Sequence, residues 1–231
     1  MPRSGTTLIE QIISSHRHVL PTGENNYMST FIKKNYLNNF SLDEKKINQH
    51  IFSDDNLFQD YVFNLFDELN HISKVFTDKS VQNFLWIGFI KIFFPNSKII
   101  ITERNSKDIC LSIFKINFKN GFMNFAYNEK DIANFYNVYL DLIEFWKEIF
   151  DEEIFIIKYE NLIDDPESQI KKMVNYCNLE WDSNCLKHHQ NRSAIKTASI
   201  SQARKPIYKS SKNLNQNYSK YLGKMFSLLK N

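Results

Sequence analysis

Apolar residues recur every three to four positions over several stretches of the chain, and short runs of β-branched residues lie between these stretches. In residues 6–15, one helical face carries Leu8, Ile9, Ile12 and Ile13, which predicts a helix with this face toward the core. Similar patterns predict further helices at residues 25–37, in one or two pieces within 41–70, at 82–94, from 106 onward, at 131–150 and at 167–177.

Three short segments have the composition of strands: residues 74–79, 98–104 and 154–159. Residues 98–104 hold a continuous β-branched run, which is typical of a buried parallel strand. Because strands and helices alternate, we expect an α/β fold with a three-layer arrangement, in which a parallel, doubly wound sheet is flanked by helices.

Two of the predicted helices are strongly apolar. Residues 82–94 are apolar on nearly all sides, so this helix is expected to be buried. The helix at 131–150 has an aromatic stripe that we interpret as a core face and not as a cofactor site; the stripe consists of Phe135, Val138, Tyr139, Leu142, Ile143 and Trp146.

The composition suits one domain spanning residues 1–231, with 42% hydrophobic and 15% aromatic residues, and it excludes a disordered tail. The 29 basic and 26 acidic residues give a net charge of +3, so no broad surface for nucleic acid is expected and any anion site must be local. Three cysteines without Cys-x-x-Cys spacing are expected to be reduced, as in the cytoplasm. No apolar run has the length of a transmembrane helix.

The strongest chemical signal is the segment Pro2-Arg3-Ser4-Gly5-Thr6-Thr7, directly before the first predicted helix. A glycine among hydroxyl residues at a helix N-terminus presents backbone N–H groups to an anion, and Arg3 adds a planar cation suited to oxyanions. The segment therefore predicts a phosphate or sulfate site, although a turn with a threonine N-cap would have the same sequence. It is not a Walker A loop, because the lysine of that motif is missing, and this disfavours a conventional ATPase.

Two further charged residues follow predicted turns. Glu24 comes after a glycine turn at the start of a helix, where it is a candidate general base or a charge that compensates the helix dipole. Lys79 ends the strand at 74–79, where open α/β sheets place ligand contacts, so it is either a cation facing a transferred group or a surface lysine.

A second anion site is predicted at the end of the strand at 98–104. Arg104 ends this strand, and Ser112 lies on the helix that follows. Two neighbouring anion sites indicate a nucleotide with two separated phosphates. Residues 192–215 are basic and contain no acid, which is typical of a solvated tail but also suits a loop that folds over a bound anion.

No metal site is predicted. His16 and His18 stand at the end of a helix without a nearby cysteine or acidic cluster, so they are interpreted as solvent-facing or capping residues.

Taken in order, these segments resemble the sulfotransferases often fused to tetratricopeptide repeats, relatives of tyrosylprotein sulfotransferases. The resemblance covers essentially the whole chain; it rests on residues 2–8, 22–24, 78–79, 98–112, 159–162, 197–199 and 204–211. It implies a P-loop-like fold that binds 3′-phosphoadenosine 5′-phosphosulfate (PAPS) and moves its sulfuryl group to an acceptor hydroxyl on a protein tyrosine, a sugar or a small molecule.

The resemblance also implies roles for single residues. Arg3, Ser4, Gly5, Thr6 and Thr7 would hold the 5′-phosphosulfate. The 3′-phosphate would bind Arg104 and Ser112, and the nucleoside would bind Tyr159 and Ser199. Glu24 would be the base, with Lys79 and Arg3 stabilising charge on the transferred group, and no metal is required in this scheme.

The chain departs from the family pattern in three places. The strand that normally precedes the loop is absent, which suggests a truncated start with possible tetratricopeptide repeats upstream. Ser80-Val81 stands where relatives usually carry a proline. Residues 213–217 lack an expected aromatic-basic stretch. Two rival interpretations remain open: a kinase-like P-loop protein that uses ATP and Mg²⁺, and a truncated or degenerate nucleotide-binding module without activity.

Overall fold

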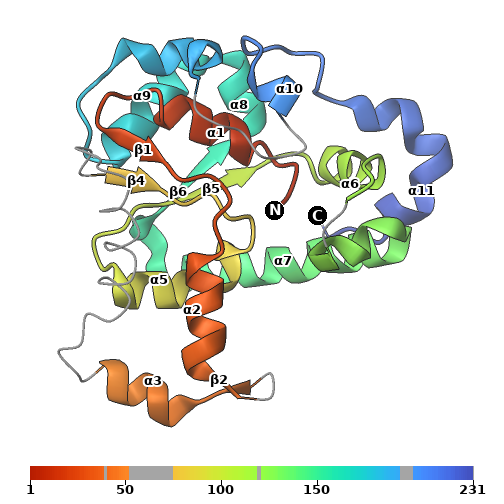
Figure 1. Cartoon of the computed structure of the whole chain (residues 1–231). Helices are drawn as coiled ribbons and strands as arrows, with labels where there is room; N and C mark the ends of the chain where they lie inside the picture. Colours follow the sequence, from red (N-terminus) through yellow and green to blue (C-terminus); the bar gives the residue numbers. More distant parts are fainter. Residues whose placement is uncertain (39–40, 52–74, 119–120, 193–199, 231) are drawn as a thin grey trace.

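The computed structural model describes residues 1–38, 41–51, 75–118, 121–192 and 200–230. Parallel strands flanked by helices form its centre, which confirms the predicted fold class. In Figure 1, α1, α8 and α9 cover one face of the strands, and α5 and α7 lie against the other. The bounds of these helices are Thr6–Ile13 (α1), Ile87–Phe93 (α5), Glu129–Phe150 (α7), Tyr159–Asp164 (α8) and Pro166–Tyr176 (α9).

The strands occur in two parallel pairs. In the first pair, β1 (Val19–Pro21) lies beside β4 (Val75–Thr77), and in the second β5 (Ile99–Glu103) lies beside β6 (Ile154–Lys158). Two short strands, β2 (Leu37–Asn38) and β3 (Ser41–Leu42), pair antiparallel. Within the described residues, β4 is hydrogen-bonded to β1 alone and β5 to β6 alone.

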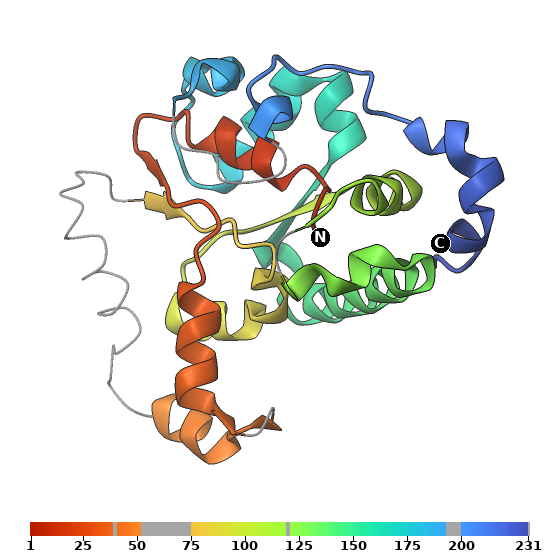
Figure 2. The same ribbon diagram turned by 45° about the vertical axis from the view of Figure 1, so that its right-hand side comes forward.

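Helices α2 (Tyr27–Tyr36) and α3 (Glu44–Ile51) project from one end of these layers in both views (Figures 1 and 2). The prediction of helix within 41–70 is confirmed for α3, and the rest of that range lies outside the described residues. The remaining elements are η1 (Asn83–Leu85), α6 (Ser106–Phe114), η2 (Gly121–Tyr127), η3 (Asp151–Glu153), η4 (Ser183–Gln190), α10 (Ile200–Ala203), η5 (Leu214–Tyr218) and α11 (Ser219–Ser227).

Side-chain caps fix the starts of several helices. Asn105 accepts a hydrogen bond from the backbone of Asp108 at the start of α6, and Asn128 caps α7 through the N–H groups of Lys130 and Asp131. Helix α9 has Asp165 as its N-cap and Pro166 in its first turn. These local signals explain why the start of each helix lies close to its predicted position.

The buried residues form three clusters. One joins α1 to β6 and α9, the second joins α6 and α7 to α11, and the third joins α2 to α5. Met1 is buried in the second cluster, together with Ile101 of β5. The three cysteines are free thiols, of which Cys110 and Cys185 are buried.

The prediction of a buried helix at 82–94 is wrong. This range forms η1 and α5, in which Ile87 and Phe93 are buried whereas Ile92 is 41% exposed. Helix α5 belongs to an outer layer, and its inner face packs on the aromatic rings of α2. Within α5, only the face that carries Ile87 and Phe93 is buried, although the sequence is apolar on nearly all sides.

Two smaller expectations also need correction. Val138, placed on the core stripe of α7, is 65% exposed, because the helix buries the face that carries Ile132, Tyr136 and Ile143. Of the two histidines interpreted as solvent-facing or capping, His18 is exposed, whereas His16 is buried and its Nε2 lies 2.9 Å from the carbonyl oxygen of Glu180.

Candidate active site

The segment at residues 2–7, here called the anion loop, has an unusual backbone. Arg3 has a φ of 66° and Gly5 a φ of 112°, both in the left-handed region. A Cβ added to Gly5 would lie 2.8 Å from Cδ2 of Tyr159, so a side chain at this position would overlap the ring. The N-terminus of α1 has no side-chain cap, which leaves its first N–H groups directed toward the loop.

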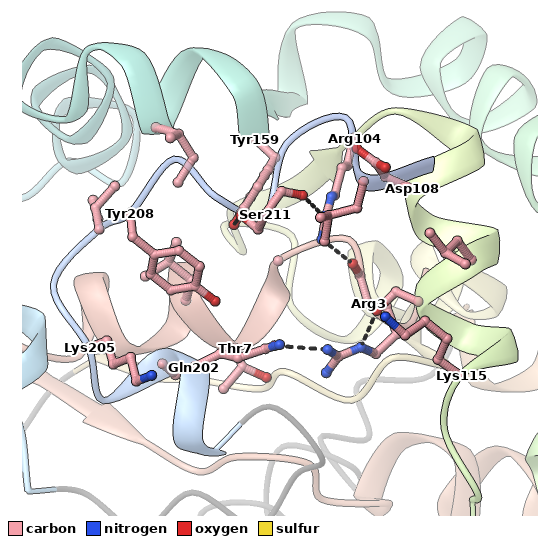
Figure 3. Close-up of a pocket in the computed structure, with 18 of the residues that line it drawn as sticks. Arg3, Thr7, Arg104, Asp108, Lys115, Tyr159, Gln202, Lys205, Tyr208 and Ser211 are labelled. Atoms are coloured by element: carbon pink, nitrogen blue, oxygen red, sulfur yellow. Dashed lines mark hydrogen bonds between the residues drawn. The ribbon is translucent and has the colours of Figure 1, made fainter. Parts of the chain in front are cut away.

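A pocket of about 330 Å³ lies beside the anion loop, between α1, α6 and the segment after α10 (Figure 3). Its charged and polar lining contains Arg3, Thr7, Arg104, Asp108, Ser112, Lys115, Tyr159, Gln202, Lys205, Tyr208 and Ser211. Residues 200–215, here called the C-terminal strap, form one side of this pocket, and Figure 3 shows Lys205 and Tyr208 opposite Arg3 and Arg104.

Two arginines meet in the pocket. Arg3 donates from Nε to Oγ of Ser112 at 2.9 Å and from a terminal nitrogen to Oε1 of Gln202 at 2.8 Å. Arg104 donates to the carbonyl oxygen of Arg3 at 3.2 Å. Burial lowers the pKa of Arg3, and the nearby charge of Arg104 lowers it further. Two like charges held this close favour an anion between them.

Arg104 is held in place from two sides. Its guanidinium lies 4.6 Å from the centroid of the Tyr159 ring and donates to the carbonyl oxygen of Ser211 at 2.7 Å. Its Nε is buried and has no hydrogen-bond partner among the described residues. A buried donor without a partner is costly unless a ligand accepts its hydrogen bond, so the pocket fits an oxyanion.

The one carboxylate among the described lining residues is already engaged. Both oxygens of Asp108 accept hydrogen bonds from the strap, one from the backbone of Asn213 at 2.8 Å and the other from the backbone and side chain of Asn215, each at 2.8 Å. The lining cations are Arg3, Arg104, Lys115 and Lys205. The pocket is therefore cationic, which suits a ligand with several negative charges.

Glu24 and Lys79 form an ion pair. The Nζ of Lys79 lies 2.6 Å from Oε1 of Glu24; the lysine side chain is 7% exposed and the glutamate 37%. Each residue follows the end of a strand, β1 or β4, and parallel pairing brings the two ends together. Neither side chain lines the cationic pocket.

Glu10 is a residue that the sequence did not single out. It is buried on α1, and its Oε1 accepts hydrogen bonds from the backbone of Gly23 at 2.9 Å and from Oγ1 of Thr77 at 3.4 Å. Burial raises the pKa of Glu10, whereas the charge of Lys79 and the Gly23 N–H lower it. A glutamate in an amphipathic helix gives no sequence signal of this kind.

The pocket gathers six of the predicted site residues, Arg3, Gly5, Thr7, Arg104, Ser112 and Tyr159. Ser4 is buried and donates to the carbonyl oxygen of Met1, and Thr6 starts α1 without lining the pocket. Ser199 lies outside the described residues. Lys115 and Gln202 line the pocket without having been predicted; Lys115 follows Ser112 by three residues, a helical spacing that could have indicated it.

No group of three or more His, Cys, Asp or Glu side chains among the described residues could hold a metal ion. In the same residues, no helix combines the length and apolar character needed to cross a membrane.

The fold and the pocket define an α/β protein with a cationic pocket at the carboxyl ends of parallel strands. The sequence profile of the sulfotransferase family matches residues 1–183, more than half of the chain, and the chain therefore belongs to the sulfotransferase family.

Two relatives and one solved structure are similar to this chain. An uncharacterized protein of Aquifex aeolicus (strain VF5) is 33% identical over 237 residues, covering 99% of this chain and 31% of that protein. A putative protein-tyrosine sulfotransferase of Caenorhabditis briggsae is 24% identical over 199 residues, covering 82% of this chain and 67% of the relative. The chain thus spans about a third of the length of the Aquifex relative.

The sulfotransferase domain from the curacin biosynthetic pathway has a similar structure, with a TM-score of 0.55 and 18% sequence identity. The match covers 96% of this chain and 94% of that domain. At this identity the likeness supports the fold.

Proposed function

We propose that this chain transfers a sulfuryl group from PAPS to an acceptor hydroxyl. The observation that carries the proposal is the pair of half-buried arginines, Arg3 and Arg104, in a pocket whose lining carboxylate is engaged by the strap. PAPS carries two separated anionic groups on one nucleoside, and the pocket supplies cations on two of its sides for such a ligand.

The lining residues divide between the two ends of the donor. Arg3, Gly5 and Thr7 would hold the phosphosulfate at the start of α1, with Ser4 and Thr6 shaping the anion loop. Arg104 and Ser112 would hold the 3′-phosphate. Tyr159 would face the nucleoside, as would Ser199, which lies outside the described residues.

The ion pair of Glu24 and Lys79 supplies the groups that the reaction needs. Glu24 would accept the proton of the acceptor hydroxyl while the bond from the acceptor oxygen to sulfur forms. Lys79, assisted by Arg3, would stabilise the negative charge on the phosphate oxygen when its bond to sulfur breaks, so that adenosine 3′,5′-bisphosphate leaves. Their separation of 2.6 Å holds base and cation together before the acceptor arrives.

Binding is tested by calorimetric titration with adenosine 3′,5′-bisphosphate beside ADP with Mg²⁺. We expect selective binding of the bisphosphate, and an Arg104→Ala variant should bind it about 10- to 100-fold more weakly, because charge-assisted hydrogen bonds are lost. Arg17→Ala, which alters an exposed arginine outside the pocket, is the control and should bind normally. Preference for ADP with Mg²⁺ would favour a kinase-like protein, and binding of neither would favour a degenerate module.

Catalysis is tested by transfer of labelled sulfuryl groups from PAPS to tyrosine peptides, sugars and phenols. The name of the Caenorhabditis relative makes tyrosine peptides the first choice. We expect Glu24→Gln and Lys79→Ala to lower kcat by about 10²- to 10⁴-fold while the bisphosphate still binds. Near-normal turnover in Glu24→Gln would remove Glu24 from the role of base.

A further inference from the structure

Glu10 connects the anion loop to the ion pair of Glu24 and Lys79. It lies five residues after Gly5, on the helix that begins at the loop, and it is 6% exposed. Its Oε1 contacts the turn after β1 through Gly23 and the end of β4 through Thr77. One carboxylate therefore bridges the helix and the ends of two strands.

Gly23 is held at both of its peptide groups. Its N–H donates to Glu10 at 2.9 Å, and its carbonyl oxygen accepts from the backbone N–H of Lys79 at 3.0 Å. The preceding residue, Thr22, donates from its backbone and its hydroxyl to the carbonyl oxygen of Thr77, at 3.2 and 2.5 Å. Because Glu24 is the next residue along the chain, these bonds fix where its side chain starts.

The charged residues around Gly23 also indicate that Glu10 positions the turn that carries Glu24. Lys79 is buried beside two glutamates, and it pairs directly with Glu24, not with Glu10. Burying a carboxylate is unfavourable unless hydrogen bonds satisfy it, and the bonds to Glu10 come from the turn that carries Glu24. If position 10 served only to pack α1 against its neighbours, an apolar residue there would give a more stable fold.

We propose that Glu10 is a positioning residue for sulfuryl transfer: through the N–H of Gly23 it sets the turn that places Glu24 against Lys79. This inference rests on the proposed function. Glu10 lies on the helix that begins at the anion loop, but it acts on the turn that carries Glu24. Glu10 itself touches neither the pocket nor the reacting atoms.

The test compares Glu10→Ala, Glu10→Gln and Gln11→Ala. The glutamine variant retains an oxygen that accepts from Gly23. Gln11 is the control, since it is the next residue on α1 and equally buried but makes no contact with the turn through its Oε1. For each variant we would measure the melting temperature, the Kd for adenosine 3′,5′-bisphosphate, and kcat and KM with PAPS and the acceptor that the wild-type chain uses best.

We expect Glu10→Ala to lower kcat by about 10- to 100-fold, which is the cost of a misplaced base, with the Kd for the bisphosphate within about twofold of wild type. Glu10→Gln should retain kcat within about threefold, and Gln11→Ala should retain it while losing stability. If Glu10→Ala lowers kcat no more than Gln11→Ala, or weakens bisphosphate binding in parallel, Glu10 acts through general stability and the inference is wrong.

Amide hydrogen exchange separates this inference from the proposed function. Exchange at Gly23 should become faster in Glu10→Ala but not in Gln11→Ala, whatever reaction the chain catalyses. Unchanged exchange at Gly23 would overturn the inference while leaving sulfotransfer intact. A wild-type chain that binds no bisphosphate and transfers no sulfuryl group would overturn the proposed function and the catalytic role of Glu10 together.

Discussion

Gly5 and Gly23 both have left-handed backbones but differ in what surrounds them. A Cβ at Gly5 would overlap the Tyr159 ring, whereas nothing lies within 4 Å of one at Gly23. Gly5→Ala should therefore cost about 2 to 5 kcal/mol of unfolding free energy, from backbone strain plus overlap, and Gly23→Ala about 1 kcal/mol from strain alone. Urea denaturation of both variants measures the difference; equal costs would show that the ring moves away freely.

Asp78 gives stability a specific dependence on pH. Burial raises the pKa of Asp78 from 3.8 to about 6, although hydrogen bonds from Ser80 and Asn83 act in the opposite direction. Since the folded state binds this proton more tightly than the unfolded state, the stabilisation is present below pH 4 and is lost as the pH rises through 6.

An Asp78→Asn variant removes this titration. Its stability relative to wild type should increase by about 1 to 3 kcal/mol between pH 4 and pH 7, as measured by urea denaturation at both values. Glu148→Gln, at an exposed position in the last turn of α7, is the control and should show no such change. A pH-independent difference for Asp78→Asn would contradict the prediction.

At the scale of elements, the C-terminal strap depends on one carboxylate of α6. Asp108 is 2% exposed and accepts hydrogen bonds from both Asn213 and Asn215. In Asp108→Ala, trypsin should cut after Lys209 and Lys212 at least tenfold faster, because the strap opens more often, and the Kd for the bisphosphate should rise about tenfold or more.

A second variant of the same strap provides the control. Asp164 forms an exposed ion pair with Lys212 at 2.6 Å, and exposed pairs contribute little to stability. Asp164→Asn should therefore leave the rate of cleavage close to wild type. Equal sensitivity of the two variants would mean that surface charge, and not the buried carboxylate, holds the strap.

The sequence predicted elements best where local and global signals agree. Strands β5 and β6 were predicted to within one or two residues from their β-branched runs, and α9 from the proline at its start. Helix α8 was missed, because Tyr159 and the residues after it were interpreted as the end of a strand. The exposure of α5 could not be predicted, since it depends on the layer in which the helix lies.

The site residues likewise divide into those that local sequence signals predict and those that depend on tertiary structure. Arg3, Arg104 and Ser112 were predicted because their chemistry and their places beside a helix or strand end are visible in the sequence. Glu10 was not predicted, because α1 packs on two sides. The apolar face of α1 contacts β6 and α9, while Glu10 on the other side contacts the turn after β1 and the end of β4. Such two-sided packing comes from tertiary structure and leaves no period in the sequence.

At the scale of the whole molecule, α11 is part of the central core. Met225 is fully buried in the cluster that α11 shares with α6 and α7. Met225→Ala should lower the unfolding free energy by about 2 to 5 kcal/mol, and circular dichroism and tryptophan fluorescence should report the same urea transition. Lys224→Ala, on the exposed side of α11, should have little effect. Separate transitions would show that α11 unfolds on its own.

The pocket also has a consequence for how the protein is made. Arg3 and Gln202, whose side chains meet, are 199 positions apart in the sequence. At about 5 to 20 residues per second, the ribosome needs roughly 10 to 40 seconds to add the residues between them. During that time the anion loop can fold onto α1 but has no strap opposite it. Under the proposed function, we expect donor nucleotide to bind only those chains whose translation has passed the strap, so that prematurely terminated products do not compete for it.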